Sequence, residues 1–233
     1  MAVKLVKPIN YKNIEKITDA DFEKQLKLLG VNSKFIVALS GGPDSLALLY
    51  LAKNFAKKNN LKFTAVSIDH NLREDSSKEI EWIKKLMKKE KVCFVTKKVK
   101  KKISSSNTLS KARKHRYELL TDVCKKNKFK YLLTAHHLDD EIETFLMRLI
   151  RGSGIKGLSS LKPVSKHKGG EINIIRPLLK YSKKCLIKYL ATIKQSYLYD
   201  NTNQNMKYDR SRIRGIAENL INEGLDKKRI LEV

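Results

Sequence analysis

Short apolar runs alternate along the chain with longer segments in which apolar and polar positions recur at helical spacing. The apolar runs predict buried strands at residues 35–39, 63–68, 92–96, 131–135 and 172–175. The amphipathic segments predict helices at residues 19–29, 44–58, 76–90, 107–127, 139–151, 182–195 and 206–222. Because strands alternate with helices, we expect an α/β fold in which about five strands form a doubly wound parallel sheet. A short helical C-terminal extension would follow the sheet.

Polar residues follow three of the expected strands at the point where each strand ends. Ser40 follows the first strand, Asp69 and His70 follow the second, and His136 and His137 follow the fourth. In a doubly wound sheet, ligands bind at the carboxyl ends of the strands. The pattern therefore predicts that these residues lie at one functional edge.

The first of these positions carries the hexapeptide SGGPDS, residues 40–45. Gly41 and Gly42 have no Cβ, so their backbone N–H groups can approach an anion closely. The hydroxyl groups of Ser40 and Ser45 add donors, and the N-terminus of the following helix favours negative charge. Asp44 fits beside a phosphate if it binds Mg²⁺. The turn lacks the Gly-Lys-Ser/Thr ending of a Walker A loop, and an ordinary capped strand–helix turn is the structural alternative.

The chain is strongly basic, with 50 Lys and Arg residues against 24 Asp and Glu and a formal charge of +26. Such an excess favours a polyanionic partner, although a compositional bias toward lysine would produce much of it as well. Only ten of the basic residues are arginine, and nine of these lie in the motif segments described below. We expect these arginines to mark positions where a planar guanidinium binds phosphate.

The three cysteines, Cys93, Cys124 and Cys185, are far apart and form no C-x-x-C pair. This spacing argues against zinc, iron–sulfur and disulfide frameworks and favours a reducing cytoplasm. The N-terminus has no apolar signal core, and no segment is apolar enough to span a membrane. We therefore expect a cytoplasmic protein.

The hexapeptide SGGPDS resembles the SGGxDS signature of the PP-loop family, the N-type ATP pyrophosphatases. These proteins are similar in fold to the adenine-nucleotide α-hydrolases. We expect three segments: an N-terminal helical extension (1–30), a PP-loop ATP pyrophosphatase domain (31–199) and a basic helical C-terminal segment (200–233). The resemblance implies that ATP is cleaved to AMP and pyrophosphate while a substrate oxygen becomes adenylated.

Further stretches between about residues 33 and 215 are similar to motifs of one PP-loop subfamily, the tRNA(Ile)-lysidine synthetases. They are IDHNLR (68–73), SKARKHRYELL (110–120), TAHHLDDEIETFLMRLIRGSGIKGL (134–158), RPLL (176–179) and DNTNQNMKYDRSRIR (200–214). Two features depart from the pattern. Glu141 replaces the usual glutamine, and the chain resembles a short form without the extra C-terminal domains of larger members.

The resemblance implies a ligase that uses ATP and Mg²⁺. It would join the side-chain amine of free L-lysine to the wobble cytidine of an isoleucine tRNA with a CAU anticodon, through an adenylated cytidine. The decoding specificity of the tRNA would change from methionine to isoleucine. A homodimer is left open.

Candidate residues follow from the matched motifs. ATP would be bound by Ser40, Gly41, Gly42, Pro43, Asp44, Ser45, Asp69 and His70, with Asp44 also the metal ligand. The catalytic candidates are Asp44, Arg113, Asp140 and Glu143. Lysine or tRNA would be bound by Arg116, Tyr117, His136, His137, Arg151, Arg210, Arg212 and Arg214.

Each group has a plainer structural interpretation. Arg113, Arg116 and Tyr117 share a helical face that could simply be solvated. The acidic residues of LDDEIE also favour the first turn of a helix without any catalytic role. His70 could be a structural cap, the arginines at 210–214 a solvated tail, and the lysine run at 97–102 a solvated loop.

Two rival functions differ in class. A PP-loop tRNA thiolation enzyme shares the turn, but it would need cysteines where this chain has none. A non-catalytic RNA-binding protein with a vestigial turn is disfavoured because Ser40, Asp44 and Ser45 are intact.

Overall fold

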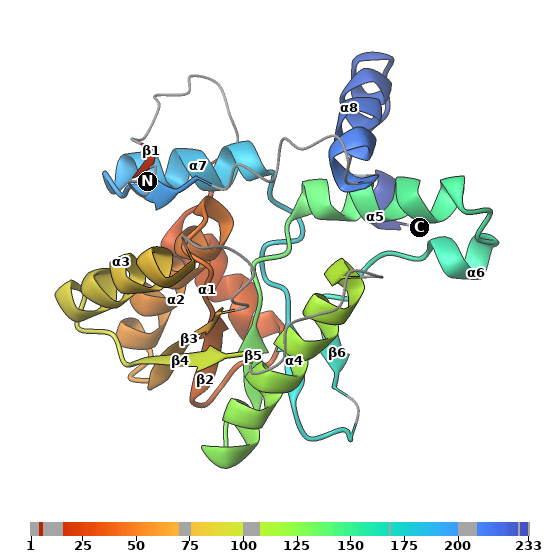
Figure 1. The fold of residues 1–233 in the computed structure, drawn as a ribbon. Coiled ribbons are helices and arrows are strands. Elements are labelled where there is room, and N and C mark those ends of the chain that lie inside the picture. The colour runs from red at the N-terminus through yellow and green to blue at the C-terminus, as the bar shows by residue number, and fades with distance from the viewer. Residues whose placement is uncertain are drawn as a thin grey trace.

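The computed structural model of the 233-residue chain describes residues 5–6, 16–69, 76–99, 108–167, 169–199, 209–227 and 229–232. Its central sheet has six strands in the order β4-β3-β2-β5-β7-β6 (Figure 1). The strands are β2 (Phe35–Ala38), β3 (Phe63–Asp69), β4 (Phe94–Lys98), β5 (Tyr131–Leu133), β6 (Val164–Lys166) and β7 (Asn173–Ile175). All neighbours are parallel except β6 and β7. The expected α/β class with a parallel sheet is confirmed.

The sheet has one strand more than the apolar runs predicted. The additional strand, β6, is a short edge strand that pairs antiparallel with β7. Its residues are exposed or half-buried, so it lacks the apolar run that identifies a central strand. A turn containing Gly169 and Gly170, both with positive φ, joins the two strands.

Helices follow the strands in the expected alternation. They are α1 (Asp19–Leu28), α2 (Pro43–Lys58), α3 (Ser76–Lys89), α4 (Thr108–Lys126), α5 (Leu138–Ile150), α6 (Ile155–Leu158), α7 (Lys183–Thr192) and α8 (Asp209–Asn222), with a 3₁₀ turn at Arg229–Glu232. The short helix α6 was not among the predicted helices. The helix boundaries otherwise agree with the hydropathy pattern to within a few residues, as is usual for helix ends.

Strand β2 shows how the two faces of the sheet are covered. Phe35 and Val37 point into the larger core with α1, α2, α3 and α7, whereas Ile36 and Ala38 point into a second core with α4. This alternation follows from the two-residue period of a strand. A continuous apolar run therefore predicts a strand buried on both faces, as β2 is (Figure 1).

The first helix belongs to the main core. Thr18 caps α1 through a capping box with Asp21, and Phe22 and Leu26 are completely buried. Residues 16–30 are thus packed against the sheet-covering helices. The proposed boundary at residue 30 stays a prediction.

A third, smaller core lies beside the sheet. Its buried side chains come from α5, α8 and the C-terminal 3₁₀ turn, and they are Leu138, Ile142, Leu146, Ile213, Ala217 and Ile230. Figure 1 shows α8 standing on α5 at the upper right of the molecule. This core brings the basic C-terminal helix against the acidic helix α5.

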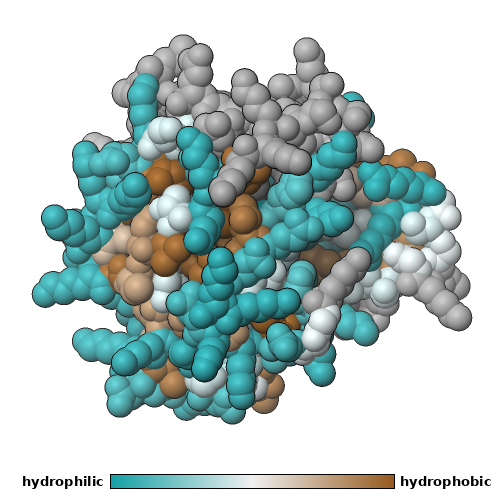
Figure 2. All heavy atoms as spheres, turned by 60° about the horizontal axis from the view of Figure 1, so that its bottom comes forward, coloured by the Kyte–Doolittle hydropathy of each residue, from teal (hydrophilic) through white to brown (hydrophobic). Residues whose placement is uncertain are grey.

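The surface agrees with the composition. Figure 2 shows mainly hydrophilic side chains on one face, with apolar side chains visible between them. Within the part of the chain that the structure describes, no helix combines the length and the apolar character needed to cross a bilayer.

Candidate functional site

The SGGPDS turn links the end of β2 to the start of α2. Gly41 has a φ of +84°, and a Cβ added there would lie 2.4 Å from Leu198 Cδ1. Leu198 also donates its backbone N–H to Gly41 O at 3.0 Å. Both the left-handed backbone and the close approach of Leu198 therefore require glycine at this position.

Hydrogen bonds within the turn fix the position of its serines. Ser45 Oγ accepts from Ser40 N and from Ser40 Oγ, both at 3.1 Å, and donates to Gly42 O at 3.0 Å. Gly42 is the N-cap of α2 and supplies no side-chain acceptor, and Pro43 occupies the first helical turn. Because Gly42 has no side chain, it does not cap the N-terminal N–H groups of α2. An anion-binding helix end requires such uncapped N–H groups.

Asp44 lies between two cationic groups. Its Oδ2 atom is 3.5 Å from His137 Nε2 and 3.6 Å from Lys183 Nζ. Burial opposes ionisation of Asp44, but the hydrogen bond and charge of His137 and the charge of Lys183 outweigh it and lower the pKa of the carboxyl. The other oxygen, Oδ1, is buried and has no hydrogen-bond partner among the described residues. Asp44 is therefore ionised, with one oxygen available to a further ligand.

His137 is buried and connects the turn to α5. Burial favours the neutral ring, but the hydrogen bond to Asp44 and the charges of Asp140, Asp44 and Asp139 outweigh it and raise the pKa to about 9. The protonated ring has no acceptor, so the 3.4 Å approach of Asp140 N to Nδ1 adds nothing to the helix cap. The cap is made instead by Asp140 Oδ2, which accepts from His137 N at 3.1 Å. His137 thus orients Asp44.

His136 has a different environment. Arg113 donates from Nη2 to His136 Nε2 at 3.0 Å, and the opposite ring nitrogen lies 3.0 Å from Thr134 Oγ1. Because an arginine can only donate, Nε2 is the acceptor and Nδ1 carries the proton. The Arg113 guanidinium also lies 5.5 Å from the centre of the Tyr117 ring. The half-buried Arg116 sits on the same helix, so α4 presents cations beside the functional edge.

The two acidic residues singled out on α5 lie in one charged group. Asp140 is half-buried, and only 2% of Glu143 is exposed. Arg214 of α8 donates to Glu143 Oε1 from Nε at 2.8 Å and from Nη2 at 2.7 Å. Burial lowers the pKa of Arg214, but the charges of Glu143, Asp140 and Asp44 outweigh it and raise the pKa. Arg214 therefore pairs directly with Glu143, and the charges of Asp140 and Asp44 add to the stabilisation of its charged form.

The remaining candidates are dispersed. Asp69 ends β3 and is buried, with its backbone oxygen accepting from Val99 N at 2.9 Å. Arg151 and Arg212 are exposed. His70 and the side chain of Arg210 lie outside the described residues. The contact of His70 with ATP and the contact of Arg210 with lysine or tRNA stay predictions.

Three residues at the site were not anticipated in these roles. Lys183 contacts Asp44, as described above. Asp139 accepts from Lys183 N at 2.6 Å and from Lys227 Nζ at 2.9 Å, so it joins α5 to α7 and to the C-terminal segment. Glu141, known from the sequence only as a departure from the motif, accepts from Leu161 N at 2.7 Å. The LDDEIE pattern predicts that these acidic residues begin a helix, but it does not predict which residues from distant parts of the chain contact them.

The cysteines are unsuited to sulfur chemistry. Cys124 and Cys185 are buried, and burial raises the pKa of the Cys124 thiol to about 12. Cys93 is exposed and does not pair with either of them. In the described part of the chain, no group of three or more His, Cys, Asp or Glu side chains is arranged to hold a metal.

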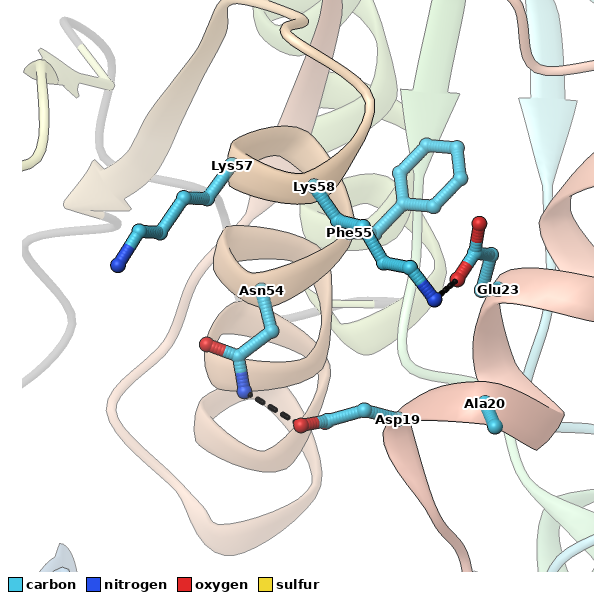
Figure 3. Close-up of a pocket in the computed structure, with 7 residues that line it drawn as sticks. All are labelled: Asp19, Ala20, Glu23, Asn54, Phe55, Lys57 and Lys58. Carbon is cyan, nitrogen blue, oxygen red and sulfur yellow. Dashed lines mark hydrogen bonds and ion pairs between the residues drawn. The ribbon is translucent and has the colours of Figure 1, made fainter.

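A surface pocket of about 410 Å³ lies elsewhere, between α1 and the C-terminal half of α2 (Figure 3). Two polar pairs lie in it: Lys58 contacts Glu23 at 2.7 Å, and Asn54 donates to Asp19 at 2.9 Å. Since the turn begins α2 and this pocket adjoins its other end, the two are separate.

The comparisons with known proteins agree with the geometry. The chain belongs to the PP-loop domain family, whose profile matches residues 13–221. It is 45% identical over 182 residues to a tRNA(Ile)-lysidine synthase of Rickettsia bellii (strain OSU 85-389), covering 78% of this chain and 42% of the relative. It is 41% identical over 202 residues to the tRNA(Ile)-lysidine synthase of Wolbachia pipientis wMel, covering 85% of this chain and 46% of the relative. The predicted family resemblance is confirmed.

The chain spans less than half the length of these two relatives. Among solved structures, it is similar to the U34-tRNA thiolase NcsA from Methanococcus maripaludis, with a TM-score of 0.75, covering 92% of this chain and 76% of that one. At 23% sequence identity this likeness confirms the fold alone. The PP-loop match supports the use of ATP.

Proposed function

We propose that this chain is the catalytic part of a tRNA(Ile)-lysidine synthetase. It would join free L-lysine to the wobble cytidine of an isoleucine tRNA with a CAU anticodon, and convert ATP to AMP and pyrophosphate. The observation that carries the proposal is that His137 contacts both Asp44 of the SGGPDS turn and Asp140 of α5. A phosphate site and a site for an amine are thereby adjacent, as the reaction needs. The identity to relatives of that name supports the same substrates.

In the first step, the carbonyl oxygen of cytidine attacks the α-phosphorus of ATP, the bond between the α-phosphorus and the bridging oxygen breaks, and pyrophosphate leaves. Ser40 to Ser45 would hold the phosphates through backbone and hydroxyl donors. Arg113 and Arg116 lie on the helix beside the edge and would stabilise charge on the phosphorus oxygens. In solution the cytidine oxygen is a poor leaving group, and adenylation removes that barrier.

Asp44 fits a Mg²⁺ ion by the chemistry of its free oxygen. Oδ1 is buried without a hydrogen-bond partner among the described residues, and a single carboxylate with phosphate and water oxygens is a usual Mg²⁺ environment. A bound Mg²⁺ would neutralise phosphate charge. His137 would keep Asp44 oriented for this role.

In the second step, the lysine side-chain nitrogen attacks the activated carbon of the base and AMP leaves with its oxygen. The amine is mostly protonated near neutral pH, because its ordinary pKa is about 10.4. Asp140 and Glu143 would bind the ammonium group, and Asp140 is the more exposed of the two and suited to accept its proton. In this structure Arg214 holds one Glu143 oxygen, so lysine would share that carboxylate or displace the arginine.

The tRNA would approach through exposed cations near the site. Arg151 and Arg212 are exposed, and the formal charge of +26 supports salt-sensitive binding of RNA. The anticodon base is single-stranded, so it can enter a pocket without breaking a duplex. We further propose a cytoplasmic location, and homodimerisation stays open.

The test is incubation with ATP, Mg²⁺, free lysine and total tRNA, with pyrophosphate release and nucleoside masses measured together. We expect pyrophosphate release that depends on tRNA, and a cytidine whose mass increases by one lysine less one water. Asp44→Ala should abolish adenylation and leave tRNA binding nearly unchanged. A thiolated nucleoside would support the rival enzyme, and tRNA binding without pyrophosphate release would support a non-catalytic binder.

A further inference from the structure

The phosphate turn contains no cation of its own. Its six residues include one carboxylate, Asp44, and no lysine or arginine. The terminal phosphates of ATP are strongly anionic, and a Walker A loop meets this charge with a lysine inside the loop. A cation supplied from another part of the fold would do the same here.

Lys183 is placed to be that cation. It is the first residue of α7, which packs against α2, and its Nζ atom reaches Asp44 Oδ2 at 3.6 Å. Its side chain is 33% exposed, so part of it is accessible to solvent beside the turn. Figure 1 shows α7 and α5 together above the sheet.

The backbone and the ammonium of Lys183 are held differently. Its backbone N donates to Asp139 Oδ2 at 2.6 Å, a short hydrogen bond to a carboxylate. Its ammonium approaches Asp44 at 3.6 Å, which is longer than a normal hydrogen bond. Since lysine carries its charge on a flexible four-carbon stem, the ammonium can move while the backbone stays fixed.

We propose that Lys183 binds the terminal phosphates of ATP at the SGGPDS turn, and the pyrophosphate that leaves. The proposal rests on the nucleotide-binding part of the proposed function and on no step that involves tRNA or lysine. Asp44 holds the ammonium beside the turn until the phosphates arrive. A purely structural role, in which Lys183 only neutralises Asp44, is the alternative.

Calorimetric titrations of Lys183→Met with pyrophosphate, a non-hydrolysable ATP analogue and AMP separate these roles. We expect affinity for pyrophosphate and the ATP analogue to fall about 10- to 100-fold, the range for a lost charge-assisted hydrogen bond. AMP lacks the terminal phosphates, so its affinity should change less than about twofold. Lys184→Met is the matched control, because Lys184 is the exposed neighbour on the same helix, and it should bind all three ligands normally.

Two results would overturn the proposal. One is an equal loss of affinity for AMP and for pyrophosphate in Lys183→Met. The other concerns the Asp44→Asn variant, titrated with pyrophosphate in the absence of divalent ions. If Lys183→Met no longer lowers the affinity for pyrophosphate in that variant, the proposal is wrong. A lysine that only neutralises Asp44 has no function once the charge of Asp44 is gone. Because these titrations contain neither tRNA nor lysine, failure to form lysidine would leave their interpretation unchanged.

A second measurement uses the unaltered protein and does not depend on folding of a variant. Lysine acetylation by an amine-reactive reagent is followed residue by residue, with and without ligand. Pyrophosphate should protect Lys183 and leave Lys184 reactive, whereas AMP should protect neither. Equal reactivity of Lys183 with and without saturating pyrophosphate would refute the contact.

Discussion

The phosphate turn and the cluster of carboxylates on α5 lie side by side, but they differ in how far apart in the sequence their interacting residues are. The hydrogen bonds among Ser40, Gly42 and Ser45 join residues at most five positions apart. The pair between Glu143 and Arg214 joins residues 71 positions apart, and both belong to helices outside the sheet. The serines of the turn are therefore positioned by contacts within a short local sequence, whereas the cluster of α5 carboxylates with Arg214 exists only after α8 has packed onto α5.

This difference predicts different responses to mutation. A local turn fails when its backbone geometry is altered, and its failure is confined to ligand binding and nearby packing. A distant ion pair fails when either partner is lost, because the other charge is then left buried. The predictions below proceed from the largest expected effect on stability or binding to the smallest.

Arg214→Met should destabilise the fold by about 3 kcal/mol, because it leaves the buried Glu143 carboxylate without its guanidinium. Urea unfolding of Arg214→Met and of the unaltered protein at neutral pH measures this.

Arg212→Met is the control for that experiment, because Arg212 is exposed on the same helix and should change stability by less than about 0.5 kcal/mol. A loss for Arg214→Met no larger than that for Arg212→Met would show that α8 does not depend on the pair.

Gly41→Ala should weaken binding of an ATP analogue at least tenfold and destabilise the fold by about 1–3 kcal/mol. The new Cβ would combine a left-handed φ with the clash against Leu198. Gly30→Ala is the matched control, since Gly30 has a similar φ of +75° but nothing within 4 Å of its added Cβ. Calorimetric titration and urea unfolding of both variants separate clash from backbone strain. Equal effects in the two variants would contradict the importance of Leu198.

Glu141→Gln should stabilise the protein at pH 8 within the range of about 0.5–2 kcal/mol common for single stabilising changes. Burial raises the pKa of Glu141, although the hydrogen bond from Leu161 N opposes this rise. The cost of ionising Glu141 in the fold is absent below its unfolded pKa and grows as pH rises toward the folded value. A glutamine does not ionise, so the gain should vanish near pH 4. Thermal unfolding from pH 4 to pH 8 tests this, and a gain that is constant with pH would assign it to packing alone.

Replacing Cys93, Cys124 and Cys185 together by alanine should leave pyrophosphate release and lysidine formation unchanged. Two of the three thiols are buried, and burial disfavours the reactive thiolate of Cys124. A modest loss of stability from the buried positions is expected. Loss of turnover in folded protein would restore thiolation as the function.

The contrast between the two regions also explains what could be predicted from the sequence. The turn and the central strands were predicted correctly, because glycines, apolar runs and helix starts act over a few residues. The edge strand β6 was missed, since its exposed residues carry no apolar pattern. The contacts of Lys183 and Arg214 with acidic residues could not be predicted from the neighbouring sequence. They depend on how α7 and α8 pack against α2 and α5, and the spacing of residues along the chain does not predict that packing.

The contact between Gly41 and Leu198 sets an order of events during synthesis. The rear of the turn is completed by a residue far downstream, whose strand β8 (Tyr197–Leu198) pairs with β1 (Leu5–Val6). A nascent chain emerging from the ribosome can form β2 and the start of α2 early, but it lacks Leu198 until most of the domain has been translated. The packing of Leu198 against Gly41 is therefore completed late in translation.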